Sequence, residues 1–417
     1  MQRDSRLFYG WVIVGVSFLT QFLIAGSIFY SLAIVLTDLA DEFSGGQRAP
    51  ILGLQLAAGI STAVMGPFIG RLAGSGRIRG LMVVGAASTG LGLIALAHAT
   101  TLWQLGLIFG TLLAFGGNTL SGITASTLVV NWFEERRAIA LGVSQLGSSV
   151  GGMVLAPVFA SIVAASGWRG AYELMGYVLL GAVVLIAWLV VGRPEDQGEL
   201  PDGKPAPPGE GPLPGAAAEG DSKFRTLDAL KEKNLWLIVL ATGFSFMATT
   251  AILNNIVAYG TDAGFSTASA AWLVSVAAGG AAAGKLVFGW LSDRIGPSSA
   301  FAISLSAEAL GLVALTAGEG YGVVVGLVFF TGVAFGGTLP LSSAILAACF
   351  GREKFGPMMG LMFPLAIPLQ LSGPIYAGWI YDSTGSYDLA FWSFAVVLIL
   401  AAGLVRLVRP AADLAPA

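Results

Sequence analysis

Two ionisable side chains lie inside long apolar stretches of this 417-residue sequence. Lys285 interrupts an apolar run over 268–291, and Glu308 lies in the middle of another over 298–318. A charged side chain at the centre of a bilayer costs about 2.5–3.5 kcal/mol on insertion scales, so each residue marks a candidate functional site. An ammonium group in a low-dielectric cavity attracts a carboxylate strongly, because bulk water screens neither charge. Lys285 is therefore a candidate anion-binding residue, and Glu308 is a candidate for proton movement.

Each of these residues also has a purely structural interpretation. Lys285 lies eight residues before Asp293, roughly 12 Å along a helix, and a lysine side chain can extend toward the cytoplasmic membrane surface. For Glu308 the alternative is a protonated or hydrogen-bonded carboxyl group between two helices. His98, the single histidine, lies at the outer end of an apolar stretch and is expected at the membrane interface rather than in a proton relay.

Amides and phenols in the middle of apolar segments supply the few directed hydrogen bonds that a mostly apolar pocket needs. Buried amides also join helices to one another, so at best half of such residues should touch a substrate. Adjacent asparagines point about 100° apart on a helix, so only one of a pair should face a pocket. The candidate substrate contacts are Tyr30, Asn118, Gln145, Asn254, Asn255, Gln370 and Tyr376.

Membrane-spanning helices must position these residues. Hydrophobic residues make up 55% of the chain and charged residues only 11%, whereas soluble proteins carry about 25% charged residues. Crossing a bilayer core takes about 20 apolar helical residues. The sequence predicts an all-α membrane protein and excludes a soluble enzyme, a secreted scaffold and a nucleic-acid-binding protein. Twelve segments fit, near 10–37, 50–70, 79–99, 102–130, 137–164, 170–191, 234–260, 268–291, 298–318, 320–348, 355–381 and 387–408.

A proline-rich segment divides the twelve spans into six and six. Residues 193–233 contain seven prolines among charged residues and glycines, and such a segment cannot bury enough apolar surface to fold alone. We predict a flexible cytoplasmic linker there, with a short helix around 226–233. It would join an N-terminal six-helix bundle over 1–192 to a C-terminal six-helix bundle over 234–417.

The basic residues predict the orientation of the spans, because Lys and Arg in short loops stay on the cytoplasmic side. Of 21 basic residues, Arg48 and Arg169 fall outside and Lys285 falls inside a span, which leaves 18 facing the cytoplasm when both termini are cytoplasmic. We therefore expect a multi-pass protein of the cell inner membrane with both termini in the cytoplasm. A formal charge of -3 indicates no polyanionic partner, and the single Cys349 allows no internal disulfide.

Two sequence motifs occur once in each half of the chain. The fourth span contains Gly110–Gly117 and the tenth contains the similar Phe330–Gly337. In the same way, Gly70–Arg77 follows the second span and Gly289–Gly296 follows the eighth. Internal repeats of this kind are typical of transporters built from two pseudo-symmetric halves.

Twelve spans, a central hydrophilic linker and a G-x-x-x-D-R-x-G loop resemble the major facilitator superfamily over the whole chain. The C-terminal loop is complete, whereas the N-terminal copy has Gly74 where the aspartate belongs. The resemblance implies the major facilitator fold and alternating access to a site near the middle of the membrane. It also implies conformational gating by charged loop residues, which are here Asp293, Arg294, Arg136 and Arg137.

Two finer features resemble the monocarboxylate transporter family and its bacterial oxalate/formate-antiporter relatives. Tyr9, Gly10 and Trp11 open the first span, and Trp132–Gly142, with its double arginine, leads into the fifth. That family moves small organic anions such as lactate, pyruvate or oxalate, commonly with a proton or in exchange. The resemblance implies that Lys285 is at the position of the basic, carboxylate-binding residue that the family carries in the eighth span.

The sequence departs from this family at two charged positions. The family's aspartate one turn before the basic residue is Ala281 here, and its lysine in the first span falls at Phe29 or Tyr30. The ordinary proton-coupling pair is therefore missing, so either the substrate and Lys285 carry the coupling or anions are exchanged. One fixed positive charge favours a monoanion, because a dianion would leave a buried negative charge uncompensated.

We interpret the sequence as a secondary active transporter of small monocarboxylates, similar to lactate and pyruvate, with Lys285 and Glu308 as the proton-coupling groups. The alternatives are an organic anion antiporter, a major facilitator transporter of another small metabolite or drug, and a membrane receptor or membrane-embedded enzyme. The sequence shows no nucleophile–base constellation and no metal-ligand cluster, so we expect no cofactor and no metal. The expected partners are a small organic anion, protons and the lipid bilayer, and the expected state is a monomer that binds no nucleic acid.

Overall fold

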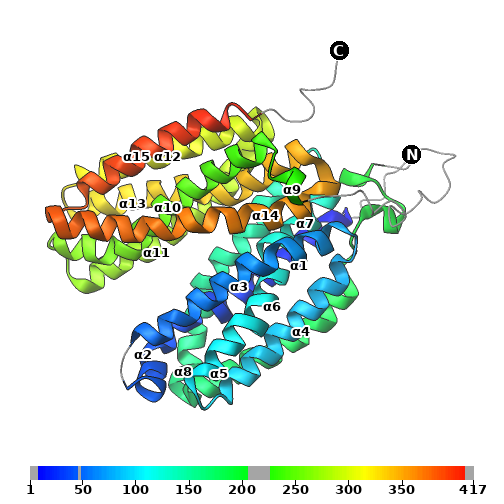
Figure 1. Cartoon of the computed structure of the whole chain (residues 1–417), viewed down its shortest axis with the longest axis horizontal. Coiled ribbons are helices and arrows are strands. Elements are labelled where there is room, and N and C mark those ends of the chain that lie inside the picture. The colour runs from blue at the N-terminus through cyan, green and yellow to red at the C-terminus, as the bar shows by residue number, and fades with distance from the viewer. Residues whose placement is uncertain (1–7, 46–47, 205–225, 409–417) are drawn as a thin grey trace. The chain divides into compact units, whose positions relative to one another are not determined.

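Helices make up almost all of this protein in the computed structural model, which describes residues 8–45, 48–204 and 226–408 (Figure 1). No β-strand occurs in these residues. The predicted all-α fold class is confirmed. The chain forms two compact units, defined below by their residues.

Unit 1 comprises Met1–Ala140, Ser144–Phe224 and Arg352–Leu361. Within it, α1 packs against α7, and α6 packs against both α3 and α4. Two π-helical turns interrupt the α-helical segments. The segments are α1 (Tyr9–Ile24), η1 (Ala25–Phe29), α2 (Ser31–Phe43), α3 (Arg48–Gly74), α4 (Ile78–Ala97), α5 (Leu102–Ile108), η2 (Phe109–Leu113), α6 (Ala114–Leu120), α7 (Gly122–Trp132), α8 (Arg137–Leu189), η3 (Pro194–Gln197) and η4 (Pro201–Gly203).

Unit 2 comprises Leu141–Val143, Arg225–Gly351 and Met362–Ala417. Its helices pack as neighbours: α11 against α13 and α10, and α12 against α15 and α13. The helices are α9 (Thr226–Ala229), α10 (Lys233–Asp262), α11 (Thr267–Ile295), α12 (Pro297–Thr316), α13 (Tyr321–Gly336), α14 (Thr338–Thr384) and α15 (Asp388–Val405).

Glycines divide the two longest helices into separate spans. Gly167 within α8 has a φ of 73° and Gly351 within α14 has a φ of 69°, values that glycine adopts readily because it has no Cβ. Each lies between two predicted spans. Among the described residues, ten helical stretches are long and apolar enough to cross a membrane, and one of them, Tyr321–Thr384, holds two predicted spans. Helix α3, which is not one of these ten, covers the remaining predicted span over 50–70 with its 27 residues.

Close contact between α11 and α13 depends on glycine. A Cβ added at Gly284 would overlap the backbone of Val333, and one added at Gly336 would overlap the backbone of Ala281. Small residues let helix backbones approach closely in membranes, where packing rather than the hydrophobic effect drives association. The repeated motif Phe330–Gly337 therefore holds α13 against α11.

A polar clamp joins three segments at one end of unit 1. Arg169 of α8 donates to both carboxylate oxygens of Glu42 in α2, with N···O distances of 2.7 and 2.6 Å, and to the carbonyl of Ala99 at 3.1 Å. Trp168 Nε1 also donates to Glu42, at 3.2 Å, and the Trp168 ring centroid lies 4.2 Å from the guanidinium carbon. The hydrogen bond from Arg169 lowers the pKa of Glu42 below its ordinary value of 4.5.

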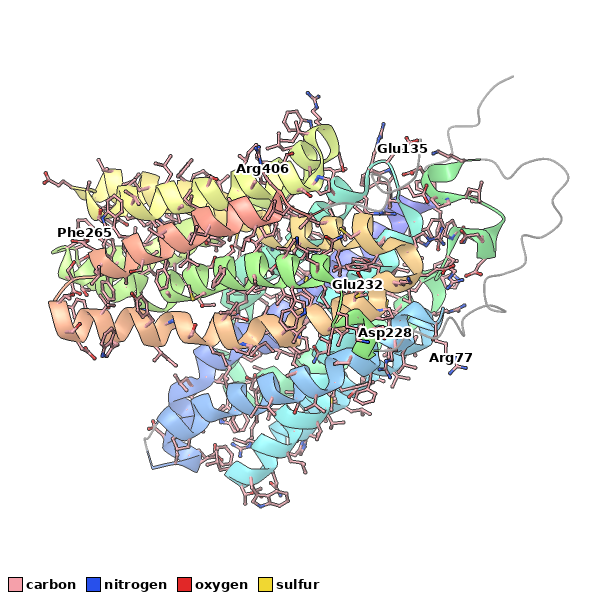
Figure 2. The ribbon with its side chains drawn as sticks, turned by 45° about the horizontal axis from the view of Figure 1, so that its top comes forward. Arg77, Glu135, Asp228, Glu232, Phe265 and Arg406 are labelled. Carbon is pink, nitrogen blue, oxygen red and sulfur yellow. The ribbon has the colours of Figure 1, made fainter. Side chains whose placement is uncertain are left out.

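The first part of the predicted linker packs against unit 1. Asp202 Oδ2 accepts hydrogen bonds from the backbone N–H groups of Glu134 and Glu135, at 3.0 and 2.9 Å, just before α8 begins. Lys204 forms a 2.8 Å ion pair with Glu135, which Figure 2 labels. The short helix expected around 226–233 corresponds to α9. Residues 205–225 lie outside the described residues, and the domain boundaries stay a prediction.

Candidate functional site

Glu308 is fully buried inside unit 2. It lies on α12 with 0% of its surface exposed. Ser245 Oγ donates to Glu308 Oε2 at 2.7 Å, and Thr249 Oγ1 donates to Oε1 at 3.0 Å. Ser245 Oγ also lies 2.7 Å from Thr338 Oγ1. Two hydroxyl groups of α10 therefore bind the carboxyl group of α12, and one of them is also bonded to α14.

Helical spacing in the sequence brings these hydroxyl groups to one face. Thr242, Ser245 and Thr249 are three and four residues apart, so they share one side of α10, and all three are buried. On α12, Ser304 lies one turn before Glu308 and donates to a backbone carbonyl of α13 at 2.6 Å. A polar strip thus lies inside an otherwise apolar unit.

The arrangement suits either protonation state of this carboxyl group. An ionised Glu308 accepts from both hydroxyl groups, which offsets part of the cost of burying a charge. A neutral Glu308 donates its proton to Ser245, whose own hydroxyl then turns to Thr338, and either atom of the Ser245–Thr338 pair can be the donor. The structure thus contains the hydrogen-bonded arrangement given as one alternative for Glu308. Its role in proton movement stays a prediction.

Lys285 is buried in the middle part of α11. The residue is only 5% exposed, so its side chain does not extend into water as the structural alternative requires. Ala281, one turn earlier, is buried as well. An ammonium group held away from water keeps a strong attraction for a carboxylate. Anion binding by Lys285 stays a prediction, and its burial is the condition that such binding requires.

Two glutamines connect helices in the interior of unit 1. Gln145 of α8 is buried and donates from Nε2 to Ser126 Oγ of α7 at 3.3 Å. Gln21 of α1, which the sequence reasoning did not select, donates from Nε2 to the Oγ and the backbone carbonyl of Ser144, both at 2.9 Å. The signal for Gln21 was its place as an amide in the middle of the first apolar span.

Tyr30 and Asn118 serve unit 1 in different ways. Tyr30 follows η1; its backbone N–H bonds to the carbonyl of Ala25 at 3.0 Å, and the residue is 41% exposed. Asn118 of α6 donates from Nδ2 to Thr62 Oγ1 of α3 at 2.9 Å and to the carbonyl of Ala114 at 2.7 Å. Because π-helical turns are frequent at functional sites, Tyr30 stays a candidate contact, whereas Asn118 joins two helices.

The neighbouring asparagines of α10 have different surroundings. Asn255 donates from Nδ2 to the carbonyl of Ala251 at 2.8 Å, and its Oδ1 accepts from the Tyr387 hydroxyl at 3.3 Å. Asn254 is exposed. The two side chains point in different directions, as helical geometry requires, and Asn254 is the one whose exposure allows it to meet a substrate.

Tyr376 and Gln370 lie on α14 with different roles. The Tyr376 hydroxyl donates to Ser393 Oγ of α15 at 2.9 Å, and its ring centroid lies 5.6 Å from that of Phe394. The backbone carbonyl of Gln370 accepts from Thr250 of α10 at 2.9 Å, while the residue is partly exposed. Tyr376 therefore stabilises the contact between α14 and α15, and Gln370 stays a candidate substrate contact.

The four candidate gating residues lie at or near helix ends. Arg136 is exposed and precedes α8, and Arg137 Nε donates to the backbone carbonyl four residues earlier at 2.9 Å. Near the end of α11, Asp293 is exposed, and the guanidinium carbon of Arg294 lies 4.2 Å from the ring centroid of Trp290. Their gating role stays a prediction.

The two short motifs that resemble monocarboxylate transporters, Tyr9–Trp11 and the start of Trp132–Gly142, lie against each other in unit 1. The ring centroids of Tyr9 and Trp132 are 5.5 Å apart, and those of Trp11 and Phe133 are 5.2 Å apart. The Tyr9 hydroxyl donates to the carbonyl of Leu189, the last residue of α8, at 2.8 Å. Aromatic pairs contribute about 0.5–1.5 kcal/mol beyond their buried area, so these motifs anchor the first span to the loop before α8.

Comparisons with known proteins agree with this architecture. The model of the Major Facilitator Superfamily matches residues 17–266 and 238–416. Monocarboxylate transporter 11 of Homo sapiens is 29% identical over 394 residues, which cover 92% of this chain and 79% of that protein. Monocarboxylate transporter 12-B of Danio rerio is 28% identical over 338 residues, which cover 76% of this chain and 70% of that protein.

Solved transporter structures share the fold. The fucose:proton symporter of E. coli matches with a TM-score of 0.69 at 18% identity, over 97% of this chain and 100% of that one. The human organic anion transporter MFSD10 matches with a TM-score of 0.70 at 14% identity, over 97% of this chain and 100% of that one. At these identities the likeness concerns the fold alone. Together the comparisons confirm the resemblance found in the sequence and the twelve-helix fold.

Proposed function

This chain belongs to the major facilitator superfamily, and on that basis we propose that it is a proton-coupled secondary transporter of small monocarboxylates similar to lactate and pyruvate. It is a multi-pass membrane transporter and not an enzyme. The relatives that match most of its length are named monocarboxylate transporters, which supports the substrate class. The buried Lys285 is the observation that carries the proposal.

Lys285 supplies the one charge that a monocarboxylate needs. A charge-assisted hydrogen bond from an ammonium group to a carboxylate is about twice as strong as a neutral one. Exposed or partly exposed polar side chains of unit 2, Asn254 and Gln370, are proposed to orient the rest of a small acid. Tyr30 is proposed as a further substrate contact. Asn118, Gln145, Asn255 and Tyr376 are proposed to hold the helices that carry these contacts.

Glu308 is the proposed proton acceptor. A proton moved together with a monoanion carries no net charge across the membrane, so the pH gradient alone drives accumulation. Oε2 of Glu308, Oγ of Ser245 and Oγ1 of Thr338 form a chain of hydrogen-bonding oxygens. Hydroxyl rotation along this chain can pass a proton between Glu308 and Thr338, whose side chain is itself buried, so exchange with water or substrate is proposed to occur when the transport cycle opens the interior of unit 2.

The proposed cycle is alternating access, in which the bundles over 1–192 and 234–417 rock about the site. The linker over 193–233 and both termini are proposed to lie in the cytoplasm, and the protein to act as a monomer in the inner membrane. Four charged residues are proposed to hold and release the cytoplasmic loops as the bundles move: Asp293, Arg294, Arg136 and Arg137.

Uptake of labelled lactate and pyruvate into proteoliposomes tests the proposal. One set carries a pH gradient with an alkaline interior, and a second set has no gradient but contains unlabelled acid. Lys285→Gln removes the charge and Lys285→Arg keeps it, while Lys233→Gln removes an exposed lysine at the start of α10 as a matched control. We expect gradient-driven accumulation by the wild type and the control, partial activity with arginine and none with glutamine.

The two sets also separate the alternatives. Uptake that needs internal acid and ignores the gradient would identify an organic anion antiporter. Absence of uptake in both sets, by protein that elutes as a folded species, would refute the monocarboxylate assignment and leave another small metabolite or a drug as the substrate. Full activity of Lys285→Gln would remove Lys285 from the site.

A further inference from the structure

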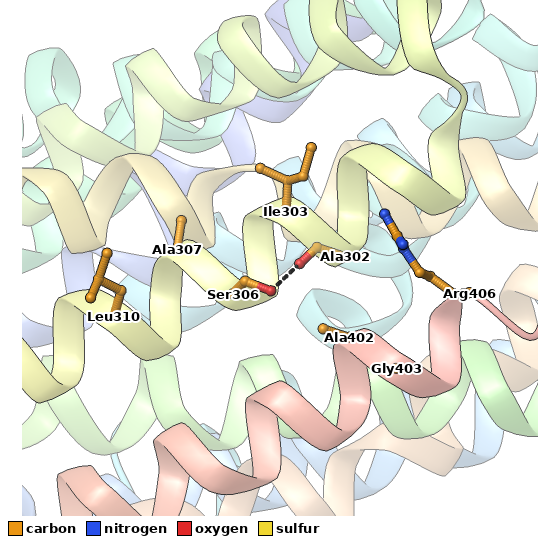
Figure 3. A pocket seen from close by; sticks show the side chains of 8 residues that line it. All are labelled: Ala302, Ile303, Ser306, Ala307, Leu310, Ala402, Gly403 and Arg406. Carbon is orange, nitrogen blue, oxygen red and sulfur yellow. Dashed lines mark hydrogen bonds between the residues drawn. The ribbon is translucent and has the colours of Figure 1, made fainter.

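A groove lies between α12 and α15 on unit 2. It is an open groove with a volume of about 440 Å³. One wall contains Ala302 and Ala307 of α12, and the other contains Ala402 and Gly403 of α15 (Figure 3). These side chains end at or before Cβ, so two helices that pack along their length leave open space between them. A Cβ added at Gly403 would meet no atom within 4 Å.

The surroundings of the groove are apolar and exposed. Ile303 and Leu310 of α12 line it, and Leu400 of α15 lies nearby in sequence; all three side chains are exposed. Exposed apolar residues on a membrane-spanning helix face lipid tails. The groove extends from Ala302 to Leu310, eight residues or roughly 12 Å of helix. This is close to the depth of one leaflet in a hydrocarbon core about 30 Å thick.

One end of the groove is positively charged. Arg406, which directly follows α15, is exposed and lines the groove together with the small residues (Figures 2 and 3). No ion pair found among the described residues involves Arg406. Ser306, the other polar lining residue, already donates to the carbonyl of Ala302 at 2.7 Å. The guanidinium group is therefore the polar group that a ligand in the groove would meet, and its planar fork suits a phosphate.

We propose that this groove binds an anionic phospholipid, with one acyl chain against α12 and α15 and the phosphate on Arg406. In the proposed orientation the end of α15 is cytoplasmic, and the cytoplasmic leaflet carries the anionic lipids. A helix from a second copy fits less well. It would bury the guanidinium group in an apolar interface, and an unpaired buried charge is strongly unfavourable.

Lipid retention by the purified full-length protein tests the inference independently of transport. The protein in detergent is mixed with phosphatidylglycerol or phosphatidylcholine of identical acyl chains, and bound lipid is counted by native mass spectrometry. We expect one retained phosphatidylglycerol and about a tenfold preference over phosphatidylcholine. Both lipids carry the phosphate, but the choline ammonium cancels the net negative charge of phosphatidylcholine and so weakens its attraction to Arg406.

Three variants and a control locate the lipid. Arg406→Gln should remove the preference for phosphatidylglycerol, and Gly403→Leu should lower retention of both lipids because its side chain fills the groove. Gly403→Ala should retain lipid as the wild type does, and Arg77→Gln, which removes an exposed arginine of unit 1, should change nothing. Equal retention of the two lipids, or unchanged retention in both Arg406→Gln and Gly403→Leu, would overturn the proposal. A wild-type dimer that Gly403→Leu dissociates would also overturn it and assign the groove to a second copy.

Discussion

Replacing Glu308 by glutamine separates proton coupling from packing. The amide has nearly the shape of the acid, so its oxygen accepts from Thr249 and its NH2 group donates to Ser245, which turns to Thr338. No buried hydroxyl loses its partner, and we expect the free energy of unfolding to change by less than about 1 kcal/mol. An amide is neither protonated nor deprotonated near neutral pH, so it cannot carry the proton. Gradient-driven accumulation should therefore disappear from a protein that still folds.

The expected size of the loss follows from the number of buried carboxyl groups. Among the residues that the structure describes, Glu308 is the one acidic side chain that is buried, which predicts one proton for each monoanion. A gradient of one pH unit then supplies about 1.4 kcal/mol, and every 1.4 kcal/mol corresponds to a tenfold ratio. Wild-type vesicles should accumulate lactate up to about tenfold, whereas Glu308→Gln vesicles should only equalise the two sides.

The assay compares accumulation with exchange in the same vesicles. Labelled lactate uptake is measured under the gradient and, separately, against internal unlabelled lactate, with protein-free liposomes subtracted to correct for diffusion of the undissociated acid. Glu319→Gln, which removes an exposed carboxyl group in the loop after α12, is the matched control. We expect Glu308→Gln to keep exchange and lose accumulation. Accumulation equal to the wild type would refute the role of Glu308 as proton carrier.

Other predictions concern Lys285 and the two polar contacts of unit 1. Lys285→Gln should weaken lactate binding at least tenfold, because truncating one partner of a buried charge pair costs about 2–5 kcal/mol; isothermal titration measures the loss. Glu42→Gln should lower stability by about 0.5–1 kcal/mol, because Glu42 is 39% exposed and its pair with Arg169 is partly screened. Arg169 lowers the pKa of Glu42 from 4.5. The stability difference between the wild type and Glu42→Gln should therefore be present at pH 7 and vanish as the pH falls below the lowered pKa. Thermal unfolding at several pH values measures this difference. Asp202→Ala should lower stability by about 0.5–2 kcal/mol, because the Glu134 and Glu135 backbone N–H groups lose their acceptor. The Glu135 amide should then exchange its hydrogen faster. Unchanged exchange would contradict this role of Asp202.

The spans and their breaks were predictable from the sequence, because long apolar runs and the glycines between them act locally. Gly167 and Gly351 lie between predicted spans and have the positive φ values that end one helix and begin the next. The place of Lys285 within a span followed from the same apolar run, whereas its burial was left open because a lysine side chain can extend to the membrane surface. These inferences needed no knowledge of distant partners.

The partners of the mid-span polar residues were not predictable in the same way. A helix that is apolar on all sides gives no signal for which face turns inward, so nothing in the sequence distinguished Asn255, which bonds to Tyr387, from the exposed Asn254. Gln21 had the same local signal as the selected amides, but its partner Ser144, 123 residues away, could not be identified from the sequence. The contacts of Asp202 with the turn before α8 join residues far apart in the sequence, so no local sequence pattern could predict them.

The π-helical turn at Ala25–Phe29 sets the phase of everything that follows it in the first span. Its i to i+5 hydrogen bond, from the Tyr30 N–H to the carbonyl of Ala25, accommodates one residue more than a regular turn. Deleting one residue within the turn would therefore restore an ordinary helix and leave the direction of α2 nearly unchanged. Deleting one residue from the regular helix between Tyr9 and Glu42 would instead rotate the helix beyond it by about 100°. Glu42 would then point away from Arg169, and the clamp at that end of unit 1 would open. The turn is thus the place in the first span where a change in chain length should do the least damage.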